Sequence, residues 1–300
     1  GGNAFSHAGG AMTMTGQFTF AASTLAPLAP VLDSDCQLLV THGNGPQVGY
    51  ILARVEAALG EAYALPLEVC VAESEGEIGY VLQQTLHNLS RGRRPVTTLL
   101  TQVVVDPADP AFASPSKPIG PWFSPGHSDE LEQAGISLVR DSAGKGRRIV
   151  PSPRPLRIVE ADIVAQMLRL GVVVIAAGGG GIPVVEGDGQ LQGVEAVVDK
   201  DWATAMLAEA VEASLLVLVT SVAGVYTDFG APGEQLLGQV SAGELEALAQ
   251  QGHFPAGSMG PKVEAAIHFS RATGRPAVIC RPQDLGSAIA GTAGTIVSGE

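Results

Sequence analysis

Short runs of apolar and β-branched residues alternate along this chain with segments whose apolar residues recur at helical spacing, and this alternation constrains the fold more than any other feature. The predicted strands are residues 38–41, 96–105, 172–176, 215–220 and 277–280. The predicted helices are residues 48–59, 78–89, 160–170, a segment that begins near Lys200, a segment opened by a capping box from Ser241 to Glu244, and residues 259–272. Strands that alternate with helices predict an α/β fold, in which an open, mainly parallel central sheet lies between two layers of helices.

The segment from residue 109 to residue 155 interrupts this alternation. Six prolines fall between Pro107 and Pro125, and proline at that density excludes a helix or a central strand. The segment is also too long for an ordinary connection, so it predicts an inserted, protruding subdomain. Within it, residues 140–141 and 147–150 flank a Ser-Ala-Gly-Lys-Gly turn and predict a hairpin.

The charge balance limits the possible partners. A net charge of −13 argues against nucleic acid and anionic membranes, so we expect neither as a partner. Residues 8–32 are uncharged, but polar residues and prolines interrupt them, and no run of about 18 apolar residues predicts a membrane span. Three cysteines without a CxxC pair indicate neither a zinc site nor a disulfide framework, which fits a reducing cytoplasm. An anionic small ligand must therefore be bound by a few cations and backbone amides.

Glycine-rich turns supply candidate amides for such a ligand. They lie at residues 1–3, 43–45 and 178–181. Glycine lets backbone N–H groups approach an oxyanion, and a helix that starts just after the turn adds its positive end. Taken alone, residues 43–49 fit either a plain strand-to-helix turn or a variant dinucleotide fingerprint. Four consecutive glycines at 178–181 cost more entropy than a plain turn needs, and they predict phosphate contact.

Lysine is scarce, with four residues against thirteen arginines. Lys117, Lys200 and Lys262 stand in turn-like contexts and suggest sites that need a compact point charge, although chance surface positions are the alternative. Asp201 either caps a helix or holds the ammonium groups in place. His42 borders a tight turn and is expected to make a fixed hydrogen bond, without a catalytic role. We assign no residue as a metal ligand.

Seven motifs follow one another along nearly the whole chain. They are Thr-His-Gly-Asn-Gly-Pro-Gln-Val-Gly at 41–49, Gly-Glu-Ile-Gly at 76–79 with Leu-Gln-Gln at 82–84, Thr-Gln-Val-Val-Val-Asp at 101–106, Asp-Pro-Ala-Phe at 109–112 with Lys-Pro-Ile-Gly-Pro at 117–121, residues 176–183, Gly-Val-Glu-Ala-Val-Val-Asp-Lys-Asp at 193–201, and Gly-Ser-Met-Gly-Pro-Lys-Val at 257–263. No single motif is decisive. By the seven together, the sequence resembles the carbamate kinases of the amino-acid-kinase superfamily.

The resemblance implies a fold and an activity. It implies a three-layer αβα sandwich, in which residues 1–198 form an acceptor lobe with residues 109–155 as its protruding subdomain, and residues 199–300 form a nucleotide-binding lobe. The implied reaction is phosphoryl transfer between ATP and carbamate, to give ADP and carbamoyl phosphate, reversibly and with Mg²⁺. The family also implies a cytoplasmic homodimer with a place in arginine metabolism.

The resemblance also implies residue roles. The acceptor and the transferred phosphate would contact Gly1, Gly2, Asn3, Gly43, Asn44, Gly45, Gly178 and Gly179. Lys117 would reach in from the protruding subdomain, Lys200 would neutralise the phosphoryl group, and Asp201 would orient the lysines. The nucleotide side would include Thr220, Val222, Tyr226, Met259, Gly260 and Lys262, with Lys262 on the phosphates.

Two alternatives remain, and one departure from the family pattern stands out. Another member of the superfamily would keep the glycine turns and Lys200, but has no reason to keep the proline-rich lid with Lys117. An NADP-dependent oxidoreductase built on residues 43–49 would be indifferent to Lys200 and Lys262. The family carries an apolar strand immediately before the first Gly-Gly-Asn turn, so we expect that a start is missing before Gly1.

Overall fold

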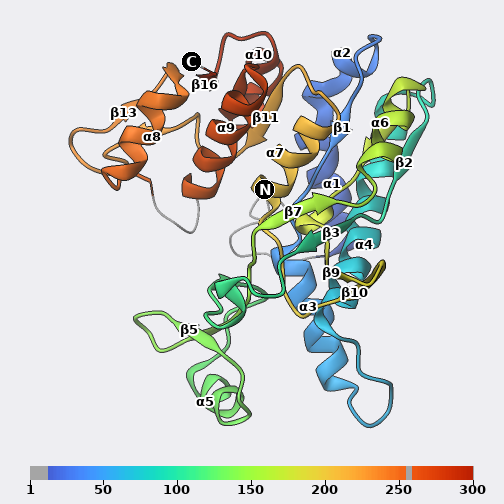
Figure 1. Ribbon diagram of the computed structural model, residues 1–300, viewed down its shortest axis with the longest axis vertical. Coiled ribbons are helices and arrows are strands. Elements are labelled where there is room, and N and C mark those ends of the chain that lie inside the picture. Colours follow the sequence, from blue (N-terminus) through green and yellow to red (C-terminus); the bar gives the residue numbers. More distant parts are fainter. Residues whose placement is uncertain (1–12, 255–258, 300) are drawn as a thin grey trace.

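The chain folds into a layered α/β body from which one segment projects (Figure 1). The computed structural model describes residues 13–254 and 259–299. The predicted turn at Gly1, Gly2 and Asn3 lies outside the described residues. Within the described parts, no helix combines the length and the apolar composition needed to cross a bilayer.

The sheets of the body mix parallel and antiparallel pairs, and parallel pairs are the more frequent. One sheet has the order β1 (Leu39–Val40), β8 (Val173–Ile175), β2 (Val96–Thr98), all parallel. A second has the order β10 (Gln190–Gly193), β9 (Ile182–Gly187), β3 (Gln102–Val105), β7 (Pro155–Ile158), with only β3 and β9 parallel. A third has the order β11 (Leu216–Val219), β15 (Ala277–Cys280), β16 (Thr295–Ser298), β14 (Gln239–Ser241), with β15 and β16 antiparallel.

Helices cover both faces of these strands, which confirms the predicted three-layer α/β fold. One face carries α1 (Met14–Leu25), η2 (Ala26–Leu28), α2 (Ala29–Leu32), α4 (Leu67–Leu89), η5 (Pro282–Asp284) and α10 (Leu285–Ile289). The other carries α6 (Ala161–Arg169), α7 (Lys200–Ala210), α8 (Ala242–Gln250) and α9 (Met259–Thr273). Strand β8 contacts both layers of helices: Val173 and Ile175 pack against the first group of helices, whereas Val174 packs against the second. Alternating side chains on a strand that is buried on both faces produce this division.

The predicted strand 96–105 is wrong as a single element. It divides into β2, which pairs with β8, and β3, which pairs with β9 and β7. The break falls at Thr101, whose N–H donates to the buried carboxylate of Glu75 rather than to a neighbouring strand. A continuous apolar run therefore serves two sheets, because a side chain replaces the ladder hydrogen bond where the chain changes sheet.

The proline-rich segment projects from the body at the lower end of the view in Figure 1. It contains η3 (Pro110–Phe112), β4 (Lys117–Pro118), α5 (Pro125–Gln133), β5 (Leu138–Arg140) and β6 (Gly146–Val150). Strands β5 and β6 pair antiparallel, which confirms the predicted hairpin, and β4 pairs with the other edge of β6.

The last strand pair of the body, β12 (Tyr226–Thr227) with β13 (Gln235–Leu236), is also antiparallel.

A contact between two glycine backbones attaches the projecting segment to α3 (Gly45–Ala57). A Cβ built on Gly49 would lie 1.9 Å from the Cα of Gly120, and the Gly120 N–H donates to the Gly45 carbonyl at 2.9 Å. Val48 and Ile51 pack with Ile119 around the same joint. The glycine at position 49 is thus required for packing against the projecting segment, which removes the reason to interpret residues 43–49 as a dinucleotide fingerprint.

We expect Gly49→Ala to lower the free energy of unfolding by about 1–3 kcal/mol, the usual cost of forcing extra atoms into a packed site. The matched control is Gly76→Ala, because Gly76 is an exposed glycine inside α4 with nothing within 4 Å of a built Cβ. That control should gain roughly 0.5–1 kcal/mol from reduced backbone entropy. Urea denaturation measures both, and equal stability of Gly49→Ala and the unmodified protein would contradict the close approach.

Candidate active site

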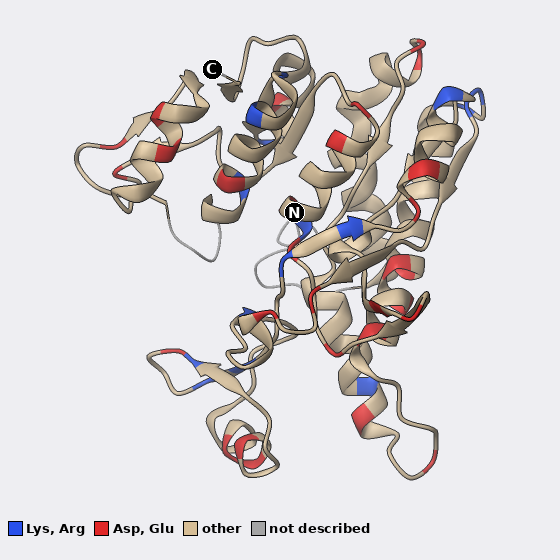
Figure 2. Cartoon of the chain, in the orientation of Figure 1, with Lys and Arg blue, Asp and Glu red and all other residues tan. Residues whose placement is uncertain are grey.

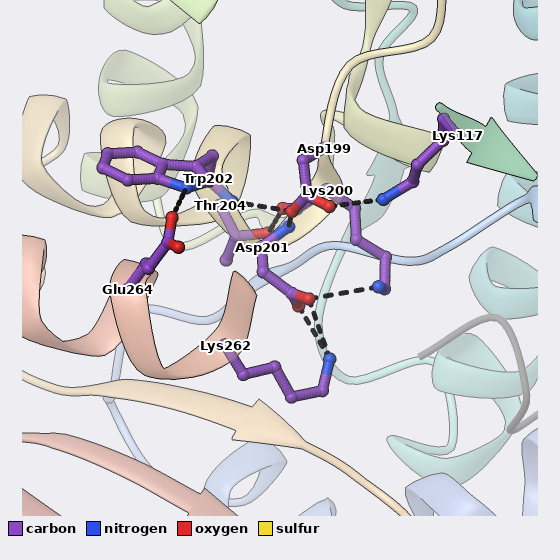
Figure 3. A network of polar contacts seen from close by, with 8 residues as sticks. All are labelled: Lys117, Asp199, Lys200, Asp201, Trp202, Thr204, Lys262 and Glu264. Carbon is purple, nitrogen blue, oxygen red and sulfur yellow. Dashed lines mark hydrogen bonds and ion pairs between the residues drawn. The ribbon is translucent and has the colours of Figure 1, made fainter. Parts of the chain in front are cut away.

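Two lysines share one buried aspartate where α7 meets α9 (Figure 3). Lys262 Nζ lies 3.0 Å from Asp201 Oδ1 and 2.8 Å from Oδ2, and Lys200 Nζ lies 3.2 Å from Oδ2. Lys200 and Asp201 are the first two residues of α7, and Lys262 is the fourth residue of α9. Each helix therefore supplies one ammonium group. Asp201 and Lys262 are both only 6% exposed, which makes this pair an interior one.

A second aspartate joins the projecting segment to the same helix. Asp199 is the N-cap of α7: its Oδ1 accepts from the N–H groups of Asp201 at 2.9 Å and Trp202 at 3.3 Å. Its Oδ2 pairs with the ammonium group of Lys117 on β4. The sequence prediction missed Asp199, although an aspartate directly before a helix is a capping signal. The alternative in which Asp201 caps the helix is wrong, because Asp199 does so.

The site carries a local positive excess. Lys117, Lys200 and Lys262 contribute three ammonium groups against the carboxylates of Asp199 and Asp201. Acidic side chains are spread over the rest of the molecule, including both the projecting segment and the helices of the body (Figure 2). An anion approaching this net-acidic chain would therefore find local attraction at the start of α7.

The charge state of Asp201 follows from its two partners. Burial alone would raise the pKa of Asp201, but the Lys200 and Lys262 ammonium groups outweigh burial and lower it to about 2. Burial lowers the pKa of Lys262, and Asp201 only partly offsets this effect. Burial also disfavours the charged form of Lys200, yet Asp201 and Asp199 together raise its pKa. The opposite directions of the two lysine pKa shifts fit the exposed fractions of the two side chains, 24% for Lys200 and 7% for Lys262.

The four-glycine run forms η4 (Gly178–Gly180) and lies against the turn that precedes α3. A Cβ on Gly178 would lie 2.4 Å from His42 Nε2, and one on Gly179 would lie 2.1 Å from the side chain of Asn44. Gly179 N–H donates to the His42 carbonyl at 2.7 Å. The structure thus brings Gly43 and Asn44 together with Gly178 and Gly179, and Gly45 follows as the first residue of α3.

The same loop also lies beside the ion pairs of Asp199 and Asp201 with the three lysines. A Cβ on Gly180 would lie 2.3 Å from the Val198 carbonyl oxygen, one residue before Asp199, and η4 contacts both α4 and α7. Gly179, Gly180 and Gly181 all have positive φ angles, of 67°, 104° and 88°. Both the backbone conformation and the lack of space exclude side chains here. The loop therefore lies beside the start of α7, and the N–H groups of Gly179, Gly180 and Gly181 donate to the carbonyls of His42, Ala177 and Gly178.

His42 is buried and uncharged. Burial lowers its pKa from 6.5 to about 4, so the imidazole is neutral at pH 7. Its Nδ1 lies 3.4 Å from the Gly43 carbonyl oxygen. Asn44 donates from Nδ2 to Ser74 Oγ at 2.8 Å, which ties the turn to α4. Neither Ser74 nor the neighbouring Glu75 was singled out from the sequence, because their partners come from other elements.

The residues predicted on the nucleotide side lie in two places. Thr220 follows β11, and its N–H donates to the Cys280 carbonyl at 2.8 Å. Val222 lies in the loop after it, and Tyr226 opens β12 with its ring 5.6 Å from that of Phe229. Met259 and Gly260 form the first turn of α9, directly before Lys262.

The comparisons with known proteins agree on one family. The model of the amino acid kinase family matches residues 1–281. The carbamate kinase of Pyrococcus horikoshii is 42% identical over 304 residues, which cover 99% of this chain and 97% of the relative. Carbamate kinase 1 of Enterococcus faecium is 45% identical over 270 residues, which cover 88% and 86%. The solved structure of the Giardia lamblia carbamate kinase bound to AMP-PNP is 36% identical, with a TM-score of 0.91 over 99% of this chain and 96% of that one.

We expect Asp201→Asn to lower the free energy of unfolding by about 3–5 kcal/mol at pH 7, because it leaves the buried Lys262 and the partly buried Lys200 ammonium groups without their carboxylate. The control is Asp284→Asn, which removes the half-buried partner of the exposed Arg281 and should cost about 0–1 kcal/mol. The pKa of Asp201 is lower in the folded state, so its contribution is complete above pH 4 and disappears as the pH falls toward 2. Urea denaturation at several pH values measures it, and equal losses in both variants would contradict the buried pair.

Acid should destabilise the protein through His42. The unfolded chain protonates this imidazole near pH 6.5 and the folded chain only near 4. The unfolding free energy should therefore fall by about 3 kcal/mol between pH 7 and 4 through this group. The unmodified protein and His42→Gln should show different slopes over this range in urea denaturation, and parallel slopes would refute a neutral buried imidazole.

Proposed function

This chain belongs to the amino acid kinase family, and on that premise we propose that it is a carbamate kinase. It transfers a phosphoryl group reversibly between ATP and carbamate, with ADP and carbamoyl phosphate as the products. One observation carries the proposal: three of the four lysines of the chain meet on two neighbouring aspartates at the start of α7. End-to-end similarity to carbamate kinases supports the identity of the substrates.

The reaction needs alignment and charge neutralisation. Carbamate is already an anionic nucleophile, so its oxygen can attack the γ-phosphorus of ATP in line while the bond to the β,γ-bridging oxygen breaks. No proton has to be removed and no covalent enzyme intermediate is required. This agrees with the neutral, buried state of His42, which has no part in our scheme.

Each charged residue has a role in this scheme. Lys200 neutralises the phosphoryl group during transfer, and Lys262 contacts the nucleotide phosphates. Asp201 fixes both ammonium groups, since both lie on its carboxylate. Lys117 reaches from the projecting segment to Asp199 and from there can meet the phosphate. Such fixed charges in a partly dry site are the largest usual source of transition-state stabilisation.

In this proposal the glycine turns contact the acceptor and the transferred phosphate, and the N–H groups at the start of α3 are the donors. Gly43, Asn44 and Gly45 lie at the start of α3, and Gly178 and Gly179 lie against them. Gly1, Gly2 and Asn3 complete this set in our proposal by resemblance to the family. Residues 1–198 would then form the acceptor lobe, with 109–155 as its protruding subdomain, and residues 199–300 the nucleotide lobe.

The nucleotide base is proposed to lie near the loop after β11. Thr220 and Val222 belong to this loop and Tyr226 to β12, while Met259 and Gly260 lie one turn before Lys262 on α9. This arrangement would align the base, the phosphates and Lys262 along the lobe.

Mg²⁺ is proposed to enter with the nucleotide. In the described parts of the chain, no group of three Asp, Glu, His or Cys side chains is arranged to hold a metal ion. Mg²⁺ commonly keeps water and substrate phosphates as ligands and adds only one or two carboxylates. Asp199 and Asp201 are the carboxylates of the site, so the residues present fit an ion held mainly by the phosphates. When bound, it would neutralise charge on those phosphates.

We further propose a cytoplasmic homodimer, by resemblance to the family.

Lys200→Ala should lower kcat/KM for ATP formation from ADP and carbamoyl phosphate about a thousandfold, roughly 4 kcal/mol of transition-state stabilisation. Lys117→Ala should also lower it. The matched control is Lys145→Ala, which removes the remaining lysine, on the exposed turn of the β5–β6 hairpin, and should leave the rate unchanged. A coupled ATP assay with Mg²⁺ measures all three. Equal rates in Lys200→Ala and Lys145→Ala would refute the assigned role, and activity with another small carboxylate in place of carbamate would identify a different kinase of the family.

A further inference from the structure

A buried glutamate lies beneath the glycine loop and has no role in the scheme above. Glu75 is on α4 and is 1% exposed. A Cβ built on Gly178 would lie 3.0 Å from Glu75 Cγ and 2.4 Å from His42 Nε2, so these two buried side chains flank Gly178. A carboxyl group is costly to bury, and its position under this loop therefore calls for a physical reason.

Glu75 is connected to both ends of the glycine loop through a single residue. Its Oε2 accepts from the Thr101 N–H at 2.9 Å. Thr101 Oγ1 accepts from the Ala177 N–H at 2.9 Å, and the Thr101 carbonyl accepts from the Ile182 N–H at 2.7 Å. Ala177 and Ile182 are the residues immediately before and after the four glycines. Thr101 thus holds the loop at both ends, and Glu75 holds Thr101.

The loop depends on such external support. Ala177 has a φ of 50°, a left-handed conformation that is unfavourable for alanine, and three of the four glycines also have positive φ. Strained backbone of this kind persists only where the surroundings determine it. The glycines have no side chains with which to anchor themselves, so backbone hydrogen bonds set their position: the two bonds to Thr101 hold the ends of the loop, and the bond from the Gly179 N–H to the His42 carbonyl holds its middle.

The environment of Glu75 favours the uncharged acid. Burial raises its pKa well above the ordinary value and the Glu160 carboxylate raises it further, while the backbone N–H groups of Thr101 and Gly178 act in the opposite direction. The nearest titratable group on the other side of the loop, His42, is neutral. Glu75 Oε1 has no side-chain partner among the described residues, so no cation stabilises an ionised form.

We propose that Glu75 is a positioning residue for the transferred phosphate: through Thr101 it fixes the glycine loop. Kept as the uncharged acid, it also adds no negative charge beside that loop. The identity of the phosphate ligand in this inference rests on the proposed function. The attachment of the loop to Glu75 does not, so the two can fail separately.

Kinetics of three variants tests the inference. Glu75→Leu removes the acceptor of the Thr101 N–H, and we expect kcat/KM for carbamoyl phosphate to fall about a hundredfold, the scale of a displacement of about 1 Å. The KM for ADP should stay within about twofold, because the nucleotide is held elsewhere. Glu75→Gln keeps the shape of the side chain and a hydrogen-bond acceptor but has no titratable proton. Its activity should match that of the unmodified protein at pH 7. At alkaline pH the unmodified protein should lose activity as Glu75 ionises, whereas Glu75→Gln should keep it. Glu73→Gln, on the exposed side of the same helix, is the control and should change nothing.

Hydrogen exchange gives a readout that does not depend on catalysis. Amides of residues 177–182 should exchange faster in Glu75→Leu than in the unmodified protein, and at the unmodified rate in Glu75→Gln and Glu73→Gln. If Glu75→Leu does not fold, Thr101→Val replaces it, because valine removes the acceptor of the Ala177 N–H, together with the Thr101 hydroxyl's own bond to the Leu99 carbonyl, at nearly constant volume. Unchanged exchange in the variant that folds, or superimposable pH profiles of Glu75→Gln and the unmodified protein, would overturn the inference. An unmodified protein that makes no ATP from carbamoyl phosphate and ADP would instead refute the proposed function, while the exchange experiment would still decide the role of Glu75.

Discussion

The arrangement of the site depends on a carboxylate that has two ammonium partners in a largely dry interior. Asp201 is held in its ionised form because Lys200 and Lys262 together outweigh the cost of burial. The partners come from two helices, so the pairing also fixes where α9 lies against α7. An interior ion pair of this kind gives little net stability over apolar packing, but it strongly penalises the loss of one member. It therefore contributes position more than stability, which is what the proposed phosphoryl-transfer site requires.

Around this pair, backbone atoms rather than side chains form the remaining surfaces. The glycine loop excludes side chains at Gly178, Gly179 and Gly180, where a built Cβ would overlap His42, Asn44 or the Val198 carbonyl. In the proposed function, a phosphate meets the N–H groups at the start of α3 on one side and the ammonium groups on the other, in a chain whose overall charge repels it. The cap of α7 connects these two parts, since Asp199 follows the carbonyl that touches Gly180 and pairs with Lys117.

Much of this could be predicted from local sequence, and the exceptions have a common cause. Alternating strands and helices predicted the layered fold, and the scarcity of lysine directed attention to Lys117, Lys200 and Lys262. Asp199 and Glu75 were missed because their partners, Lys117 and Thr101, are 82 and 26 residues away along the chain. The division of residues 96–105 into two strands has the same origin, since Glu75 takes the N–H of Thr101. Local patterns identify which residues are suited to a site, but they do not show which distant group satisfies a buried polar atom.

The joint between Gly49 and Gly120 has a consequence for how this protein can vary. Most steric conflicts in a core can be relieved by trimming the neighbouring side chain, so a second mutation can suppress the first. At this joint the neighbour is main chain on both sides, and neither position has an atom to remove. No compensating replacement at the other position exists. Intragenic suppressors of a Gly49 substitution would therefore have to act by shifting α3 or the whole projecting segment.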